Sequence, residues 1–205
     1  MNDYTMNQSN GETAIIAQQY NCFQQTLERL DKKEKYLNYG YTLRRSDTYE
    51  QRQERLCREV FNAASITPGD VIVDVGFGSG EQDFLLAREY QFKGLTGFNI
   101  ADKQVQYARE RARREKLSDK MTFSCGEAEV MMGIGDGTVD KVLAVECAFY
   151  FNRPKFYEAA ARVLKPGGLL VAADICFSDA LTGITKLKND LKIMGHYSGN
   201  RREWE

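Results

Sequence analysis

The stretch Val71-Ile-Val-Asp-Val-Gly-Phe-Gly-Ser-Gly80 decides the fold of this chain. Its apolar, β-branched start predicts a buried strand, and its glycines at positions 76, 78 and 80 predict a tight turn into a helix near Glu81. Glycine lets a backbone approach a ligand where a Cβ atom would collide. The helix N-terminus adds unpaired N–H groups and a partial positive charge. We therefore expect a ligand with negative or acceptor groups to lie across this turn.

Two cofactor classes compete for such a turn. The dinucleotide fingerprint G-x-G-x-x-G requires a third glycine three places after the second, but Glu81 stands there. A carboxylate at this point disfavours a pyrophosphate, and with it an NAD-linked dehydrogenase. The pattern present, from Asp74 to Gly80, is D-x-G-x-G-x-G, which resembles the first motif of class I S-adenosylmethionine-dependent methyltransferases. An ordinary glycine-rich turn without a cofactor stays open on this stretch alone.

Length and composition further narrow the possible classes of protein and of partner. A chain of 205 residues suits one domain, or one domain with a helical lid. Its net charge of −1 gives no reason to expect nucleic acid or a membrane surface as a partner. No apolar run approaches the ~20 residues of a membrane span. Five scattered cysteines and one histidine, His196, do not form a metal-site pattern, so we expect reduced thiols, a cytoplasmic location and no metal.

Two amphipathic helices are expected before the first strand. Thr48 to Ala64 is the second of them, with the apolar stripe Tyr49, Leu56, Val60 and Phe61. The first, from Glu12 onward, places these apolar residues on one face: Ile16, Tyr20, Phe23, Leu27 and Leu30. The loop between them, Tyr36-Leu-Asn-Tyr-Gly-Tyr41, either caps an apolar surface with its tyrosines or covers a ligand.

Strands and helices alternate after the glycine turn. The expected strands lie over 94–100, 121–124, 139–145 and 169–175, and the expected helices over 81–90, 102–116 and 152–164. Such alternation predicts parallel strands joined by right-handed crossovers. The helix 102–116 is rich in arginine, but Glu110 and Glu115 interleave with the basic residues, which favours a solvated face over a nucleic-acid surface.

Further motifs extend the resemblance to class I methyltransferases over about residues 36–175. They are Glu127-Ala128 after the third strand, Glu146-Cys-Ala-Phe-Tyr-Phe151 after the fourth, and Arg162-Val-Leu-Lys-Pro-Gly-Gly168 before the fifth. The resemblance, to the natural-product and sterol branch of this family, implies a Rossmann-like α/β fold. Its sheet is largely parallel with helices on both faces, and an N-terminal helical lid precedes it. The resemblance also implies S-adenosylmethionine as cofactor and a small, apolar or aromatic metabolite of secondary metabolism, methylated at O, N or C.

The resemblance assigns roles to individual residues. Cofactor binding is expected from Tyr39, Asp74, Gly76, Gly78, Gly80, Asn99, Ile100, Gln104, Glu127 and Ala128. Glu146 and Tyr150 are the expected catalytic residues, and Tyr41 and Phe149 the expected substrate-binding residues.

Two of these positions depart from the family pattern. Asn99 stands where an acidic residue usually binds the ribose, so the charge-assisted hydrogen bond is lost. The alternative that Asn99 only forms a turn stays open. Tyr150 stands where several relatives have a histidine base, and a tyrosine with an ordinary pKa of about 10 is a poor base near neutrality. For Glu146, a hydrogen bond to the cofactor or to loop backbone is the alternative to proton transfer.

The expected organisation is a tail over 1–11, a helical lid over 12–66, a cofactor-binding core over 67–178, and a C-terminal helix with a tail over 179–205. The family's closing strands have no counterpart after this core, so we expect the chain to lack part of the substrate pocket. His196 is not expected to be catalytic. The alternative function is a cofactor-binding but inactive subunit that completes a partner enzyme, and a homodimer is left open.

Overall fold

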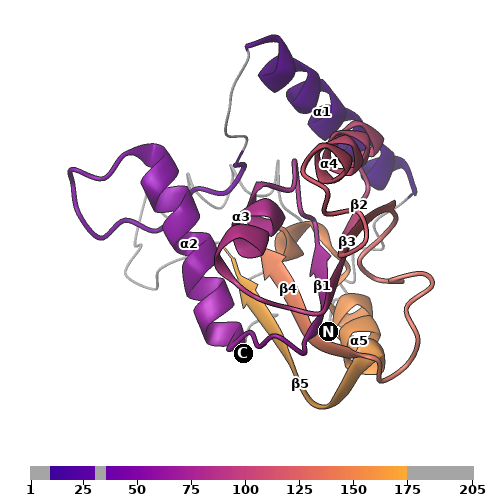
Figure 1. The fold of residues 1–205 in the computed structure, drawn as a ribbon. Coiled ribbons are helices and arrows are strands. Elements are labelled where there is room, and N and C mark those ends of the chain that lie inside the picture. Colours follow the sequence, from indigo (N-terminus) through magenta and orange to yellow (C-terminus); the bar gives the residue numbers. More distant parts are fainter. Residues whose placement is uncertain (1–9, 31–35, 175–205) are drawn as a thin grey trace, which may run out of the picture.

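A sheet of five parallel strands is the frame of the protein, whose computed structural model describes residues 10–30 and 36–174 (Figure 1). The strands are β1 (Val71–Val75), β2 (Gly94–Asn99), β3 (Met121–Cys125), β4 (Val139–Val145) and β5 (Leu164–Ala173). The helices are α1 (Asn10–Arg29), α2 (Tyr49–Ala64), α3 (Glu81–Glu89), α4 (Asp102–Arg114) and α5 (Arg153–Val163), with a 3-10 turn over Ala148–Tyr150. The predicted alternation of strands and helices is therefore confirmed.

The strand order, β3-β2-β1-β4-β5, places β1 at the centre of the sheet. Val73 of β1 lies opposite Thr96 of β2 on one side and opposite Val142 of β4 on the other. Successive strands are added outward from β1 to β3, and the chain then returns to the other side of β1. The order in which strands are added therefore reverses between β1 and β4, although all strands stay parallel. In parallel sheets, ligands bind at the carboxyl ends of the strands beside such a reversal.

Helices cover both faces of the sheet, as predicted. Alternate residues of β1 point to opposite faces: Ile72 belongs to one core cluster, and Val73 and Val75 belong to the other. Helices α2, α3 and α4 bury their apolar residues in the first cluster, and α5 buries Phe156 and Val163 in the second. None of the helices in the described ranges is long and apolar enough to cross a bilayer.

Helix α1 packs differently from the prediction. Phe23 and Leu30, placed on the buried face by their spacing, are 52% and 63% exposed, whereas Gln24 is fully buried. The helix lies beside α4 and not on a face of the sheet (Figure 1). Its partners are consequently loops and helix ends with polar groups, so apolar periodicity alone does not identify its buried face.

Smaller corrections concern the ends of elements. Tyr49, expected on the apolar stripe of α2, is 56% exposed because the helix begins there, with Thr48 as its N-cap. Strand β5 begins at Leu164, five residues before the predicted 169, and pairs with β4 through an irregularity between Val139 and Lys141. The predicted tail over 1–11 is too long by two residues, because Asn10 and Gly11 belong to α1. Residues 1–9 of that tail and the predicted C-terminal helix and tail over 179–205, with His196, lie outside the described residues.

Helix α4 holds a buried ion pair that the sequence did not predict. Arg111, expected to point outward, places its Nη1 2.7 Å from Oε1 of Glu81, and these side chains are only 13% and 3% exposed. Its guanidinium also lies 4.1 Å from the ring centroid of Phe84. Glu81 therefore faces α4 with its charge compensated, and it does not line the ligand cavity at the glycine turn.

We predict that Arg111→Met lowers the free energy of unfolding by about 3 kcal/mol, because it leaves the carboxylate of Glu81 buried without its counter-charge. Denaturant unfolding at neutral pH measures this change. The matched control is Arg114→Met on the exposed side of the same helix, which should stay within about 0.5 kcal/mol of the unmodified chain. Equal effects of the two substitutions would contradict a stabilising role of the pair.

Candidate active site

A cavity opens at the carboxyl ends of the central strands, at the point between β1 and β4 where the order of the strands reverses. Its glycine-loop part is lined by Asn38, Gly78, Gln82, Gln104 and Glu146, among others. Its β3 part is lined by Glu127, Ala128, Glu129, Asn152 and Lys155, among others. Both parts share the walls Ile16, Gly76, Asn99, Ile100, Tyr150 and Phe151. The fold therefore brings most of the predicted site residues to one cavity.

Five predicted residues do not line this cavity. Tyr39 and Tyr41 are 60% and 45% exposed, and Asp74 is buried behind the glycine turn. Gly80 packs against Phe84, and Phe149 is buried with its ring centroid 4.4 Å from that of Tyr150. Their proposed binding roles stay predictions.

The sequence missed lining residues on several elements. They are Thr13, Ile16 and Tyr20 of α1, Leu37 and Asn38 of the tyrosine loop, and Gln82 of α3, together with Glu129, Phe151, Asn152 and Lys155. Asn38 and Gln82 each stand within two residues of a predicted motif, so closeness to a motif is the signal that could have found them. The α1 residues give no such signal, because their place depends on tertiary packing.

The motif glycines pack closely against protein atoms, and two of them, Gly76 and Gly78, also line the cavity. Gly76 has a φ of 65°, and a Cβ there would lie 2.6 Å from Cβ of Cys147. Gly78 has a φ of 58°, and a Cβ there would lie 3.1 Å from Cδ1 of Leu37. These glycines allow a left-handed turn and close packing against later and earlier segments, and their contact with a ligand stays a prediction.

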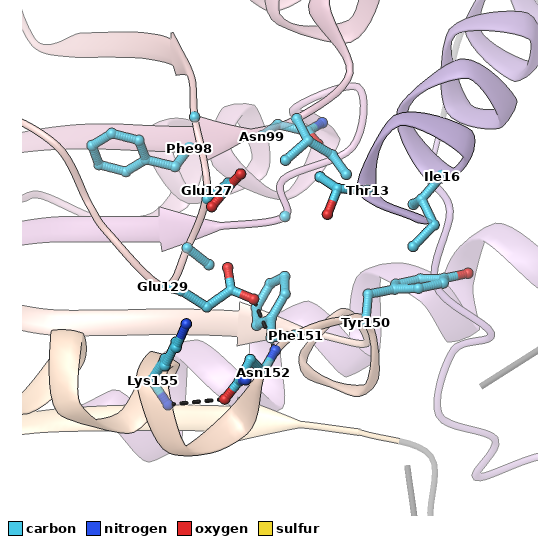
Figure 2. A pocket seen from close by; sticks show the side chains of 14 residues that line it. Thr13, Ile16, Phe98, Asn99, Glu127, Glu129, Tyr150, Phe151, Asn152 and Lys155 are labelled. Carbon is cyan, nitrogen blue, oxygen red and sulfur yellow. Dashed lines mark hydrogen bonds between the residues drawn. The ribbon is translucent and has the colours of Figure 1, made fainter. Parts of the chain in front are cut away.

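The β3 part of the cavity carries two carboxylates. Figure 2 shows Thr13 and Ile16 of α1 on the opposite side of this part from Glu127 and Glu129. Glu129 accepts a hydrogen bond from the backbone N–H of Asn152 at 2.8 Å, and burial raises the pKa of its carboxyl group. Glu127 is exposed, so of the two it is the carboxylate open to an incoming ligand.

Asn99 fastens the glycine turn to α4. Its Nδ2 donates to the carbonyl of Gly78 at 3.2 Å and to Oε1 of Gln104 at 2.7 Å. Both amide protons are thus used inside the protein. Its Oδ1 accepts a long hydrogen bond from the N–H of Ala101 at 3.5 Å and has a second lone pair for a ligand. Nε2 of Gln104 is buried and has no partner among the described residues. A buried donor of this kind is satisfied when a ligand brings an acceptor such as a hydroxyl oxygen.

The tyrosine loop 36–41 is bound through its backbone. Nε2 of Gln53 donates to the carbonyls of Tyr36 and Asn38, at 3.2 and 2.6 Å. On the opposite side, the N–H of Tyr39 donates to Oε2 of Glu146 at 2.6 Å. Glu146 itself lies in the left-handed region with a φ of 50°. The predicted alternative for Glu146, a hydrogen bond to loop backbone, is thus present in the structure, and its second oxygen has no donor among the described residues.

Burial changes the acidity of both predicted catalytic side chains. It raises the pKa of Glu146, and it also raises the pKa of Tyr150, whose hydroxyl accepts a hydrogen bond from Tyr20 at 3.0 Å. A raised pKa makes the carboxylate of Glu146 a stronger base, whereas it leaves Tyr150 protonated near neutrality.

Helix α1 is held over the cavity by polar contacts. Ser79, inside the glycine motif, donates from Oγ to Oε1 of the buried Gln24 at 2.7 Å. Asn21 binds both the side chain of Asp102 and the backbone N–H of Lys103 at the start of α4. These contacts, with the pair of Tyr20 and Tyr150, attach the helix to the glycine turn and to the mouth of the cavity.

Asp74 belongs to a buried carboxyl pair. Its side chain shares a hydrogen bond with Asp83 of α3, and Nε2 of Gln82 donates to its Oδ2 at 2.9 Å. Both aspartates are 1% exposed, and burial raises both pKa values, that of Asp83 well above the ordinary range because Asp74 lies beside it. Asp83 therefore holds a proton and donates it to Asp74.

Comparisons with known proteins agree with this geometry. A family model described as a methyltransferase domain matches residues 73–172, which run from the glycine motif to β5. The erythromycin 3''-O-methyltransferase of Saccharopolyspora erythraea is 36% identical over 141 residues, which cover 68% of this chain and 46% of that protein. The chain belongs to the class I methyltransferases.

Other relatives of this chain extend the comparison. The 27-O-demethylrifamycin SV methyltransferase of Amycolatopsis mediterranei is 29% identical over 170 residues, which cover 82% of the chain and 61% of that protein. The crystal structure of the [4+2]-cyclase SpnF matches with a TM-score of 0.73 and 26% identity over 80% of this chain and 61% of that one. The geranyl diphosphate C-methyltransferase of Streptomyces coelicolor A3(2), 18% identical, shares the fold with a TM-score of 0.74, over 94% of this chain and 76% of its own. The chain thus spans about half to three fifths of the length of these two curated relatives.

We predict that Asp83→Asn gains stability relative to the unmodified chain as the pH rises above the ordinary pKa of an aspartate. The protonated carboxyl of Asp83 contributes fully below its ordinary pKa of about 4, and this contribution is lost as the pH rises through its raised pKa. Asparagine keeps an N–H donor toward Asp74 at every pH. The difference in unfolding free energy should change by at most about 1.4 kcal/mol per pH unit.

Denaturant unfolding at a series of pH values measures this difference. Asp136→Asn is the control, because that side chain is 77% exposed and should show no such trend. A difference between Asp83→Asn and the unmodified chain that stays constant with pH would contradict the shared proton.

Proposed function

We propose that this chain transfers a methyl group from S-adenosylmethionine to a small, apolar or aromatic metabolite of secondary metabolism. The observation that supports the proposal is the single cavity at the carboxyl ends of β1, β2 and β4, which is lined by the motif residues of the methyltransferase family. The curated relatives described above are named erythromycin 3''-O-methyltransferase and 27-O-demethylrifamycin SV methyltransferase. A cytoplasmic location and a homodimer remain part of this proposal.

The polar groups of the cavity fit the proposed cofactor. Gln104 offers a buried, unpartnered donor, and Asn99 offers Oδ1 as an acceptor, which suits ribose hydroxyls. Glu127 is an exposed carboxylate beside Ala128 and suits the amino group of adenine. When bound, S-adenosylmethionine supplies a methyl group on a positively charged sulfur. The chain then has to align the acceptor, exclude water and, for O- or N-methylation, remove a proton.

Glu146 is the residue we propose as proton acceptor. It lies at the end of β4 and lines the glycine-loop part of the cavity. Its Oε2 accepts from the N–H of Tyr39, which fixes the carboxylate and leaves Oε1 for the substrate. Since burial raises its pKa, its carboxylate is a better base than an exposed glutamate. We propose that Tyr150 and Phe151 form an apolar wall of the acceptor site.

A second candidate is a protein that binds the cofactor without transferring its methyl group. The structural neighbour SpnF, at 26% identity, is named a [4+2]-cyclase and not a methyltransferase. The tyrosine at position 150, in place of a histidine base, is consistent with this alternative. Only the detection of methyl transfer by the isolated chain separates the two candidates.

We predict that the isolated chain transfers label from methyl-labelled S-adenosylmethionine to a component of a metabolite extract. It should also bind S-adenosylhomocysteine with a dissociation constant in the micromolar range by calorimetry. Binding without any label transfer would favour the second candidate, and absence of binding would contradict the proposed cofactor.

We predict that Gly78→Val weakens binding of S-adenosylhomocysteine at least about tenfold. Valine is strained at a φ of 58°, and its Cβ would press on Leu37, which covers the cavity. Calorimetry measures the affinity. Gly69→Val makes the same change where no heavy atom lies within 4 Å, and it should bind normally. Unchanged binding by Gly78→Val would contradict the site.

We predict that Glu146→Gln slows label transfer about 100-fold and leaves the affinity for S-adenosylhomocysteine unchanged. The amide still accepts from the N–H of Tyr39 but cannot take a proton. Label-transfer rates measured against pH check this, because the unmodified chain should become faster as the pH rises through the pKa of Glu146 and the variant should not. Glu59→Gln, on the exposed side of α2, is the control. Full activity of Glu146→Gln would leave Glu146 with only its contact to the tyrosine loop.

A further inference from the structure

A cluster of exposed apolar side chains lies just before α2 and at its start. We call it the loop face, and its members are Tyr39, Tyr41, Leu43 and Tyr49. In Figure 1 the chain before α2 forms a loop that extends beyond this helix at the left of the view. Single exposed apolar residues are ordinary, but several of them gathered on one surface mark a place where another surface binds.

Hydrogen bonds to α2 and to the tyrosine loop hold these side chains together. The N–H of Tyr41 donates to the carbonyl of Arg52 at 2.8 Å, and the hydroxyl of Tyr49 donates to the carbonyl of Asn38 at 3.2 Å. These bonds tie the loop to the first turns of α2, so the tyrosines on either side of Leu43 belong to one surface.

Two arginines extend the loop face. Arg44 and Arg45 follow Leu43 directly, both are exposed, and neither guanidinium group has an acidic partner among the described residues. Asp47 does not compensate them, because it already accepts from Nη1 of Arg55 at 2.6 Å. Its carboxylate also accepts from the backbone N–H of Arg44 at 2.9 Å, which closes a turn. The tip of the loop therefore carries an exposed leucine beside two uncompensated positive charges.

This combination fits the surface of an anionic bilayer. A leucine at the tip can enter the acyl region, tyrosines are favoured at the interface because their rings are apolar and their hydroxyls polar, and arginines are attracted by lipid phosphates. The other acidic residue of the segment 36–50, Glu50, lies in the first turn of α2, where the helix dipole favours a negative charge. A protein partner fits less well, because a stable protein interface takes roughly 20–30 residues from each side.

We propose that the loop face binds the protein peripherally to an anionic lipid surface, with Leu43 in the acyl region and Arg44 and Arg45 at the lipid phosphates. This binding goes beyond the proposed function and does not depend on it. The lipid surface lies beside the cavity, because the N–H of Tyr39 donates to Oε2 of Glu146. Where the proposed function holds, an apolar acceptor dissolved in the bilayer enters the cavity from this side.

Sedimentation of the chain with lipid vesicles tests the proposal. We expect binding to vesicles of phosphatidylcholine with about 30% phosphatidylserine, and binding that is about tenfold weaker to vesicles of phosphatidylcholine alone. The double substitution Arg44→Gln with Arg45→Gln should weaken binding to the anionic vesicles about tenfold. Leu43→Ser should weaken it by about the same factor, because it removes the apolar side chain at the tip.

Matched variants on other elements control for exposure and for net charge. Leu30→Ser replaces a leucine at the end of α1 that is 63% exposed, against 62% for Leu43. Arg113→Gln with Arg114→Gln removes two adjacent exposed arginines from α4. Both variants should bind the anionic vesicles like the unmodified chain, within about twofold.

Absence of vesicle binding by the unmodified chain, or an equal loss in the loop variants and in the controls, would overturn the proposal. Equal binding to both kinds of vesicle would overturn it as well, because the arginines would then play no part. If no vesicle is bound but Leu43→Ser slows label transfer in lipid-free solution, the loop face contacts the acceptor and the proposal is wrong. Vesicle binding without label transfer would instead contradict the proposed function. Should one loop variant fail to fold, as judged by thermal unfolding, the other and the two vesicle compositions decide.

Discussion

The close approach of Gly76 to Cys147 is the contact on which the site depends. It brings the carboxyl ends of β1 and β4 together at the point where the order of the strands reverses, and it allows no side chain at position 76. The turn that follows must then run through left-handed conformations to reach α3. This single path places Gly78 under Leu37 and Gln82 against the cavity. A cofactor site at the switch point of a parallel sheet follows from this packing.

Several polar contacts attach the N-terminal part to this site. Ser79 of the glycine motif binds the buried Gln24 of α1, and Glu146 at the end of β4 binds the backbone of Tyr39. Apolar burial holds α2 to the sheet, because Val60 and Phe61 lie in its main core. Breaking such a hydrogen bond costs little free energy when water replaces the lost partner. A cover attached in this way suits a cavity that must admit and release its ligands.

Much of the fold was predictable because short-range patterns specify it. The run Val71–Val75 alternates between two apolar cores. The Pro-Gly-Gly segment correctly indicated a last strand, although β5 already begins before it, at Leu164. The prediction failed where a side chain's partner is distant in sequence. Arg111 looks solvent-exposed on its helix, yet it pairs with Glu81, thirty residues away. Phe23 looks buried by its spacing, yet α1 lies beside α4 and leaves it exposed.

The sequence by itself determined the class of the protein and some of the residues around its cavity, since strand ends and glycine turns are local features that recur in one order. It determined Asn99 and Glu146 as site residues, but not what they bind. Only the tertiary structure decided that Asn99 joins the glycine turn to Gln104, that Glu146 holds the tyrosine loop, and that Gln82 stands between Asp74 and the cavity. The reason is physical: a hydrogen bond depends on the distance and direction between two groups, which the folding of the whole chain sets.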